Sequence, residues 1–171
     1  MRQLLNIFVD MCLLRAAPQD LPASPFLLGM TLLAGLVTGT VVIVETFGGL
    51  ANALLAQLLD FLLLLSLLWV ALGMVRHRAR FLQAATALCG SGVVINLVIM
   101  PLQLLLTTDP SGSLTGELAV LLYLGLIAWS LVVVGHIVRH AFEFPLWGGI
   151  LVAMNYFFLA NWLIQTLFFP D

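Results

Sequence analysis

Residues 50–75 read LANALLAQLLDFLLLLSLLWVALGMV, a run of 26 residues that holds a single charged side chain, Asp60. A helix rises about 1.5 Å per residue, and the hydrocarbon layer of a bilayer needs about 20 apolar residues to be crossed. The run is therefore long enough and apolar enough to cross. A soluble amphipathic helix would carry a polar stripe along its whole length, and this run has none. The stretch predicts a membrane-spanning helix.

The composition of the whole chain indicates the same class of protein. Of its 171 residues, 63% are apolar and 8% are charged, and the mean hydropathy is +1.17. Soluble globular proteins have roughly 45–50% apolar and about 25% charged residues, so we expect an integral membrane protein. The net charge is −2, and the chain has six arginines and no lysine. Because nucleic acids are bound by clustered cations, we expect no nucleic acid partner.

Four further stretches have the length and hydropathy of membrane spans, and a Pro-rich connector at residues 18–25 precedes the first of them. In that first span, Gly35 and Gly39 form a GxxxG pair, which favours close helix packing. We therefore predict an all-α fold with one domain at residues 26–171. Its five transmembrane helices are expected at about residues 26–44, 50–75, 81–106, 118–138 and 147–169.

The first 17 residues predict a helix of another kind. Three polar side chains recur at helical spacing and share one face: Gln3, Asn6 and Asp10. Apolar residues cover the rest, a pattern typical of a helix that lies in the membrane interface. The alternative is a secretory signal, with Arg2 at its start and residues 15–17 as its processing site. Because Asn6 and Asp10 would interrupt the apolar core of such a signal, the interfacial helix is favoured over residues 1–17.

The arginines predict the orientation in the membrane. With five spans, every segment that carries an arginine lies on the same side: Arg2, Arg15, Arg76, Arg78, Arg80 and Arg139. The positive-inside rule assigns that side to the cytoplasm. The absence of lysine and the abundance of leucine and alanine suggest a GC-rich bacterial genome. We therefore expect an inner-membrane protein with a cytoplasmic N-terminus and a periplasmic C-terminus, in which Arg76, Arg78 and Arg80 contact anionic lipid headgroups.

Polar residues inside the spans are costly in hydrocarbon and are therefore informative. Asp60 lies ten residues from the outer end of its helix, or about 15 Å into the bilayer. The same depth on other helices falls at Asn96 and Asn161. We predict a polar layer in which Asp60 is hydrogen-bonded to Asn96, Asn161 or both. This layer is either a clamp between helices or a protonatable site on an ion or proton path. No second mid-span carboxylate, lysine or histidine continues such a path, so the clamp is favoured.

One further cluster could hold a metal ion. His136 and His140 are four residues apart and Glu143 follows three residues later, so a continuous helix would align all three. Arg139 lies between the histidines and would repel a cation, so we expect headgroup contacts and no metal here. The intramembrane serines have no His/Asp arrangement around them. We therefore expect neither an enzyme nor a bound cofactor.

The arrangement resembles the Yip1 domain family over nearly the whole chain. The resemblance is topological, with five closely spaced spans, a very short outer tail, a cytoplasmic amphipathic segment and a Pro-rich stretch that contains Asp20-Leu21. Eukaryotic members bind small GTPases and organise membrane traffic, and bacterial relatives are inner-membrane proteins. The resemblance implies a non-enzymatic accessory or scaffold protein, with lipids and another membrane protein or a second copy as partners. The alternative is a small transporter or ion-conducting protein that uses Asp60.

Overall fold

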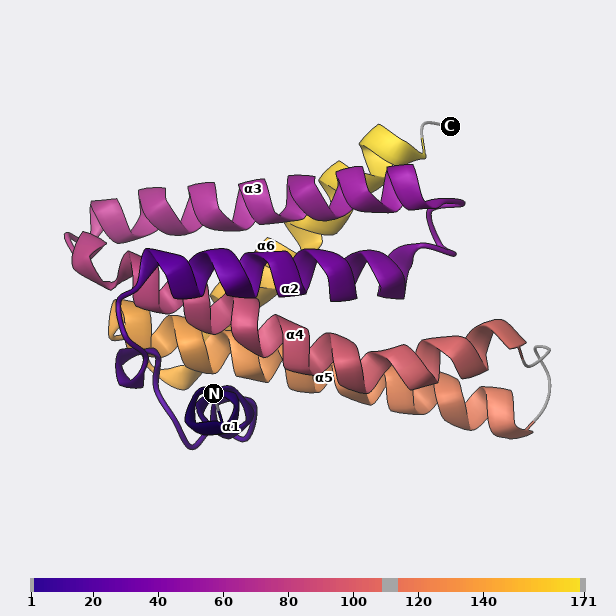
Figure 1. The fold of residues 1–171 in the computed structure, drawn as a ribbon, viewed down its shortest axis with the longest axis horizontal. Coiled ribbons are helices and arrows are strands. Elements are labelled where there is room, and N and C mark those ends of the chain that lie inside the picture. The colour runs from indigo at the N-terminus through magenta and orange to yellow at the C-terminus, as the bar shows by residue number, and fades with distance from the viewer. Residues whose placement is uncertain (1, 109–113, 170–171) are drawn as a thin grey trace.

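A computed structural model describes residues 2–108 and 114–169, and all regular structure within these ranges is helical (Figure 1). Five of the helices are long and apolar enough to cross a membrane, which confirms the predicted all-α membrane bundle. The elements are α1 (Arg2–Cys12), the 3-10 helix η1 (Pro18–Asp20), α2 (Pro25–Ile43), α3 (Leu50–Met74), the 3-10 helix η2 (Arg78–Arg80), α4 (Phe81–Thr108), α5 (Leu114–Phe142) and α6 (Leu146–Phe168).

The helix ends differ from the prediction in two places. α1 ends at Cys12 rather than near residue 17, because Leu14 takes a left-handed φ of 62°. The backbone N–H of Arg15 then donates to the carbonyl of Asp10 at 2.7 Å and closes the helix. α5 runs from Leu114 to Phe142, well beyond the predicted residues 118–138. Hydropathy marks where a helix leaves the hydrocarbon layer, whereas the helix itself can continue into the headgroup region.

α4 is the central helix of the bundle and contacts α1, α2, α3 and α5. In its most apolar window, 50% of the residues are buried inside the protein, whereas the corresponding share for α6 is 11%. The buried core lies where α1, α4 and α5 meet, and small residues such as Ala84, Ala85 and Ala87 allow the close approach. α3 and α6 lie at the periphery, where only 17% and 11% of the residues in the corresponding windows are buried inside the protein.

α1 lies across α4 and α5 rather than alongside them (Figure 1). Its apolar side chains Phe8, Met11 and Cys12 are buried against the bundle, while Asn6 and Leu5 are exposed. The ring of Phe8 lies directly over Gly90 of α4, where any Cβ atom would overlap it. This crosswise orientation is what a helix in the membrane interface requires, although its depth in a bilayer is still a prediction.

Two pairs of glycines bring helices together in different ways. Gly39 and Gly35 of α2 leave space for α3 side chains, the amide of Gln57 and the ring of Phe61 respectively. The GxxxG pair of α2 therefore makes room mainly for side chains of α3, and less for the close approach of another backbone. The backbones of α5 and α6 touch instead at Gly135 and Gly149, where a Cβ on Gly149 would overlap the carbonyl oxygen of Gly135. This contact sets the crossing of the last two helices.

The segments that carry the arginines lie at one end of the molecule (Figure 1). The α3–α4 connection holds Arg76, Arg78 and Arg80, and the end of α5 holds Arg139. The C-terminal end of α6 lies at the opposite end, where Phe168 and Phe169 contact the ring of Phe47 in the α2–α3 connection. The gathering of the arginines on one side, predicted from the sequence, is thus present in the fold.

We predict that Gly149→Ala destabilises the protein by about 1–3 kcal/mol, because the added methyl group forces α5 and α6 apart. The matched control is Gly125→Ala on α5, where a Cβ meets nothing within 4 Å and should be neutral or stabilising by up to about 1 kcal/mol. Unfolding of both variants in one detergent, followed by circular dichroism, measures the difference. Equal stability of the two variants would contradict the proposed helix contact.

Candidate functional site

A cavity of about 240 Å³ lies in the middle of the bundle, with mostly apolar walls and a few polar groups. It is formed where α2, α3, α4, α5 and α6 meet, and its polar lining groups come from α3, α4 and α6. The lining residues are Gly35, Gln57, Asp60, Phe61, Leu64, Leu88, Cys89, Gly92, Asn96, Val134 and Tyr156. Asp60 is the one acidic residue among them, so the chemistry of the cavity centres on its carboxyl group.

The carboxyl group of Asp60 is held by Tyr156 of α6. The phenolic O–H of Tyr156 donates to Asp60 Oδ1 at 2.6 Å, and its oxygen lies 3.1 Å from the backbone carbonyl oxygen of Asp60. Both side chains are partly buried. A single hydroxyl group thus binds α6 to the main chain and the side chain of α3. This is a clamp between helices, built with a partner that the sequence analysis did not name.

The predicted hydrogen bonds from Asp60 to Asn96 or Asn161 were wrong. Asn96 lines the same cavity but donates to Thr38 Oγ1 of α2 at 3.4 Å. Asn161 is exposed and donates to the backbone carbonyl of Phe157, one turn back on its own helix. Asn161 follows Tyr156 by five residues, which turns it about 140° around the helix and away from Asp60. The prediction compared how deep each residue lies in the membrane, but it did not consider the direction in which each side chain leaves its helix.

The sequence did contain a signal for Tyr156. Gly149, Ala153, Tyr156 and Ala160 follow one another at spacings of four, three and four residues and share one face of a helix. The three small residues of this set are buried against the bundle. A face made of small residues is the one that packs closely in a membrane protein. Tyr156 is the polar member of that face, and this position identifies it as an inward-facing donor.

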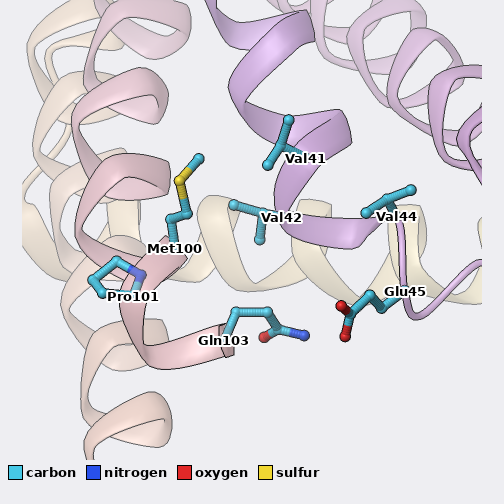
Figure 2. A pocket seen from close by; sticks show the side chains of 7 residues that line it. All are labelled: Val41, Val42, Val44, Glu45, Met100, Pro101 and Gln103. Carbon is cyan, nitrogen blue, oxygen red and sulfur yellow. The ribbon is translucent and has the colours of Figure 1, made fainter. Parts of the chain in front are cut away.

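A larger cavity than the one at Asp60 lies elsewhere and is chemically different. It has a volume of about 460 Å³ and lies between the end of α2 and the part of α4 around Pro101. Figure 2 shows Val41, Val42 and Met100 along its wall, with the polar ends of Glu45 and Gln103 turned toward each other at one side. Pro101 has no N–H to donate to the preceding turn, which opens the helix there. We interpret this cavity as a gap beside the proline and place the candidate site at Asp60.

Arg80 fastens the end of α5 to the start of α4. Its guanidinium group donates to the carbonyl oxygens of His140 and Ala141, each at 3.3 Å, and forms an ion pair with Glu143. The hydrogen bond and the positive charge of Arg80 hold the pKa of the Glu143 carboxyl group below its usual range. Arg80 therefore has a structural role at the C-terminus of α5, where the free carbonyl groups and the helix dipole favour a cation.

The other two arginines of this connection are placed differently. The guanidinium group of Arg78 lies over the indole ring of Trp69, 5.4 Å from the ring centroid, in a cation–π contact. Arg76 is exposed and takes a left-handed φ of 61° at the end of α3. The predicted headgroup contact of Arg76, Arg78 and Arg80 is not tested by these contacts and stays a prediction.

The residues considered for a metal site are engaged in other contacts. His136 and His140 do lie together, with ring centroids 4.7 Å apart, but His136 Nε2 bonds to the carbonyl of Ala16 at 3.0 Å. Glu143 pairs with Arg80 and has left the helix, since α5 ends at Phe142 and Glu143 takes a φ of 61°. Across residues 2–108 and 114–169, no three His, Cys, Asp or Glu side chains gather as metal ligands would.

Side chains of α5 hold the end of α1 against the bundle. Trp129 Nε1 donates to the carbonyl of Cys12 at 3.0 Å, and His136 Nε2 donates to that of Ala16. Both carbonyls lie at or just beyond the end of α1, where a helix leaves its last C=O groups without partners. Trp129 and His136 are seven residues apart and so share one face of α5. No sequence pattern marks the contact of α1 with α5, because the acceptors are backbone carbonyl groups.

The connector is fixed in the same manner. Gln83 Nε2 of α4 donates to the carbonyl of Leu21 at 2.8 Å, and Gln19 Nε2 donates to that of His140 at 3.0 Å. Leu21 is itself 2% exposed and belongs to the core. The segment from α1 to the start of α2 is thus an ordered part of the bundle.

No protein-family model, curated protein or solved structure matches this chain. The function has to be inferred from the geometry.

We predict that Trp129→Phe loosens α1 while the ring position stays filled. Cys12 reports the change, because it is 2% exposed and burial raises the pKa of its thiol to about 11. Loss of one hydrogen bond should raise local opening, and with it the rate of maleimide labelling of Cys12 in detergent, roughly 5- to 10-fold. Cys89, buried on α4, is the internal control. An unchanged Cys12 rate, or an equal rise at Cys89, would contradict the docking role of Trp129.

Proposed function

We propose that this chain is a bacterial inner-membrane protein that acts without catalysis, as an accessory or scaffold protein that binds other membrane components. The N-terminus is assigned to the cytoplasm in this proposal, since the arginine-bearing end is expected there. The topological resemblance to the Yip1 domain family agrees with it. Lipids, a second copy and another membrane protein are the partners that the proposal admits.

The observation that carries the proposal is the polar surface that α6 presents to lipid. Asn155, Asn161 and Gln165 are all exposed, and α6 is the least buried of the five spans. Exposed amides in hydrocarbon are costly, and across helices they form stabilising hydrogen bonds. A helix that exposes three of them gains stability from a neighbouring membrane helix. Lateral association is therefore what this surface supports best.

The cavity around Asp60 favours a second candidate function, a small transporter or ion-conducting protein. Its carboxyl group can take up and release a proton, and Tyr156, Gln57 and Asn96 surround the same space. Against this candidate, the contact with Tyr156 already gives Asp60 a structural role. Among the described residues of the spans, Asp60 is also the one carboxyl group that lines this cavity, whereas a proton path needs a series of titratable groups.

We predict that Gln165→Leu lowers co-purification of membrane partners several-fold, because it removes an amide from the lipid-facing surface of α6. The tagged chain is purified from native membranes in a mild detergent, and stoichiometric partners, including further copies, are measured by mass spectrometry. Ser66→Leu on α3 is the control, since Ser66 is also exposed and its hydroxyl already donates to Leu63 of its own helix. Equal recovery with both variants would contradict the role of α6.

Proton flux separates the two candidates. Wild-type protein in liposomes that contain a pH-sensitive dye should conduct no more protons than protein-free liposomes. Flux through the wild type that Asp60→Asn abolishes, with folding intact, would overturn the scaffold proposal in favour of transport.

A further inference from the structure

We propose that the outer side of α6 is the contact surface for a second copy of this chain, and that two copies pair through α6 with the Asn161 side chains facing each other. This inference deepens the proposed function, on which it rests, by naming the partner that the polar surface of α6 binds.

The contact surface is a heptad seam. Six residues follow one another along α6 at spacings of four, three, four, three and four, and every one of them is exposed. We call this set the outer seam: Trp147, Leu151, Met154, Phe158, Asn161 and Gln165. Alternate spacings of three and four residues are the pattern by which two helices interlock side chains in a coiled coil. Within residues 2–108 and 114–169, the seam side chains stay exposed.

The outer seam lies on the side of α6 opposite its inward face. Tyr156 and Ala160 belong to the inward face, where Tyr156 binds Asp60 and Ala160 is buried. From Tyr156 to Phe158 the helix turns about 200°, and from Tyr156 to Gln165 it turns about 180° after whole turns are removed. The Asp60–Tyr156 bond therefore fixes the rotation of α6 and, with it, the outward direction of the seam.

Asn161 is one of two amides in the seam and has unused hydrogen-bonding capacity. Its Nδ2 donates to the carbonyl of Phe157 at 2.9 Å. A primary amide has a second N–H and a carbonyl oxygen, and within residues 2–108 and 114–169 neither has a partner on another helix. Gln165 supplies a second amide one turn further along the seam. These groups face lipid, where they have no water to bind.

A second copy is the occupant that this chemistry fits. The seam carries no charge, so it calls for no oppositely charged partner. An amide is both donor and acceptor, so two Asn161 side chains that meet across a two-fold axis satisfy each other. Two copies inserted in the same direction are related by an axis along the membrane normal, which makes the two α6 helices parallel. A single polar residue at a seam position also fixes the register of such a pair.

Cysteine cross-linking tests the surface directly. Asn161→Cys places a thiol on the seam, and Leu159→Cys places one on an exposed position of α6 away from the seam, since Leu159 is 44% exposed and lies about 200° around the helix from Asn161. Copper phenanthroline treatment of proteoliposomes should give several-fold more covalent dimer with Asn161→Cys. The wild type is the background control, because Cys12 and Cys89 are buried. Equal dimer yields from the two variants would overturn the proposal.

The affinity of two copies for each other in lipid tests the role of the Asn161 amide. Fluorescence energy transfer between labelled copies, followed as liposome lipid dilutes the protein, gives the dissociation constant. Asn161→Leu should weaken pairing roughly 5- to 10-fold. Asn155→Leu is the matched control, since Asn155 is also exposed and donates to its own helix, at Leu151, but lies beside the seam. We expect it to change the constant by less than about twofold.

The outcomes separate this inference from the proposed function. A wild type that is monomeric in lipid, or an Asn161→Cys thiol that cross-links to a different protein, overturns pairing with a second copy. If that different protein also depends on Gln165 for co-purification, the scaffold proposal stands. If the dimer forms and carries protons through Asp60, pairing stands and the scaffold proposal fails.

Discussion

A carboxyl group in the hydrocarbon layer needs a polar partner, and in this protein the partner of Asp60 is the hydroxyl group of Tyr156. The contact does more than satisfy one side chain. It joins α3 to α6, two peripheral helices that otherwise have few buried residues. It also fixes how α6 is rotated, so that the small residues of its inward face meet the bundle at Gly135 and the amide of Asn161 points outward. The cavity inside and the seam outside both follow from this orientation of α6, which the close contact of Gly149 with Gly135 also holds.

A second set of contacts organises the arginine-bearing end independently of Asp60. Trp129, His136 and Gln83 hold backbone carbonyl groups of α1 and the connector, and Arg80 closes α5. Because these donors lie on α4 and α5, the N-terminal segment is bound to the two helices that contribute most to the core. The protein therefore has a firmly packed part around α4 and α5. α6 lies beside this part and carries the surface that we propose for association with other helices.

Much of the fold could be predicted from the sequence, because hydropathy and helix length are properties of local stretches. Five spans, a Pro-rich connector and the gathering of arginines at one end all follow from such stretches. The site could be predicted only in part. Depth along a helix identified Asp60 and Asn96 as members of one layer. The rotation of each helix about its axis decides which side chains meet, and the rotation of α6 turns Asn161 away from this layer. The alignment of Glu143 with His136 and His140, which a continuous helix would give, does not form because α5 ends one residue before Glu143. The contacts of Trp129 go to backbone carbonyls, which every residue has, so no sequence pattern marks them.

The most direct test of this account is the infrared band of the Asp60 carboxyl group. The protein is prepared with ¹³C-labelled aspartate carboxyl groups in lipid, and the band is assigned by its loss in Asp60→Asn. The account predicts that Tyr156→Phe shifts this band, because the hydrogen bond to Oδ1 is removed, and that Asn161→Leu leaves it unchanged. A band that shifts with Asn161→Leu and not with Tyr156→Phe would contradict it, since α6 would then face the bundle with its other side.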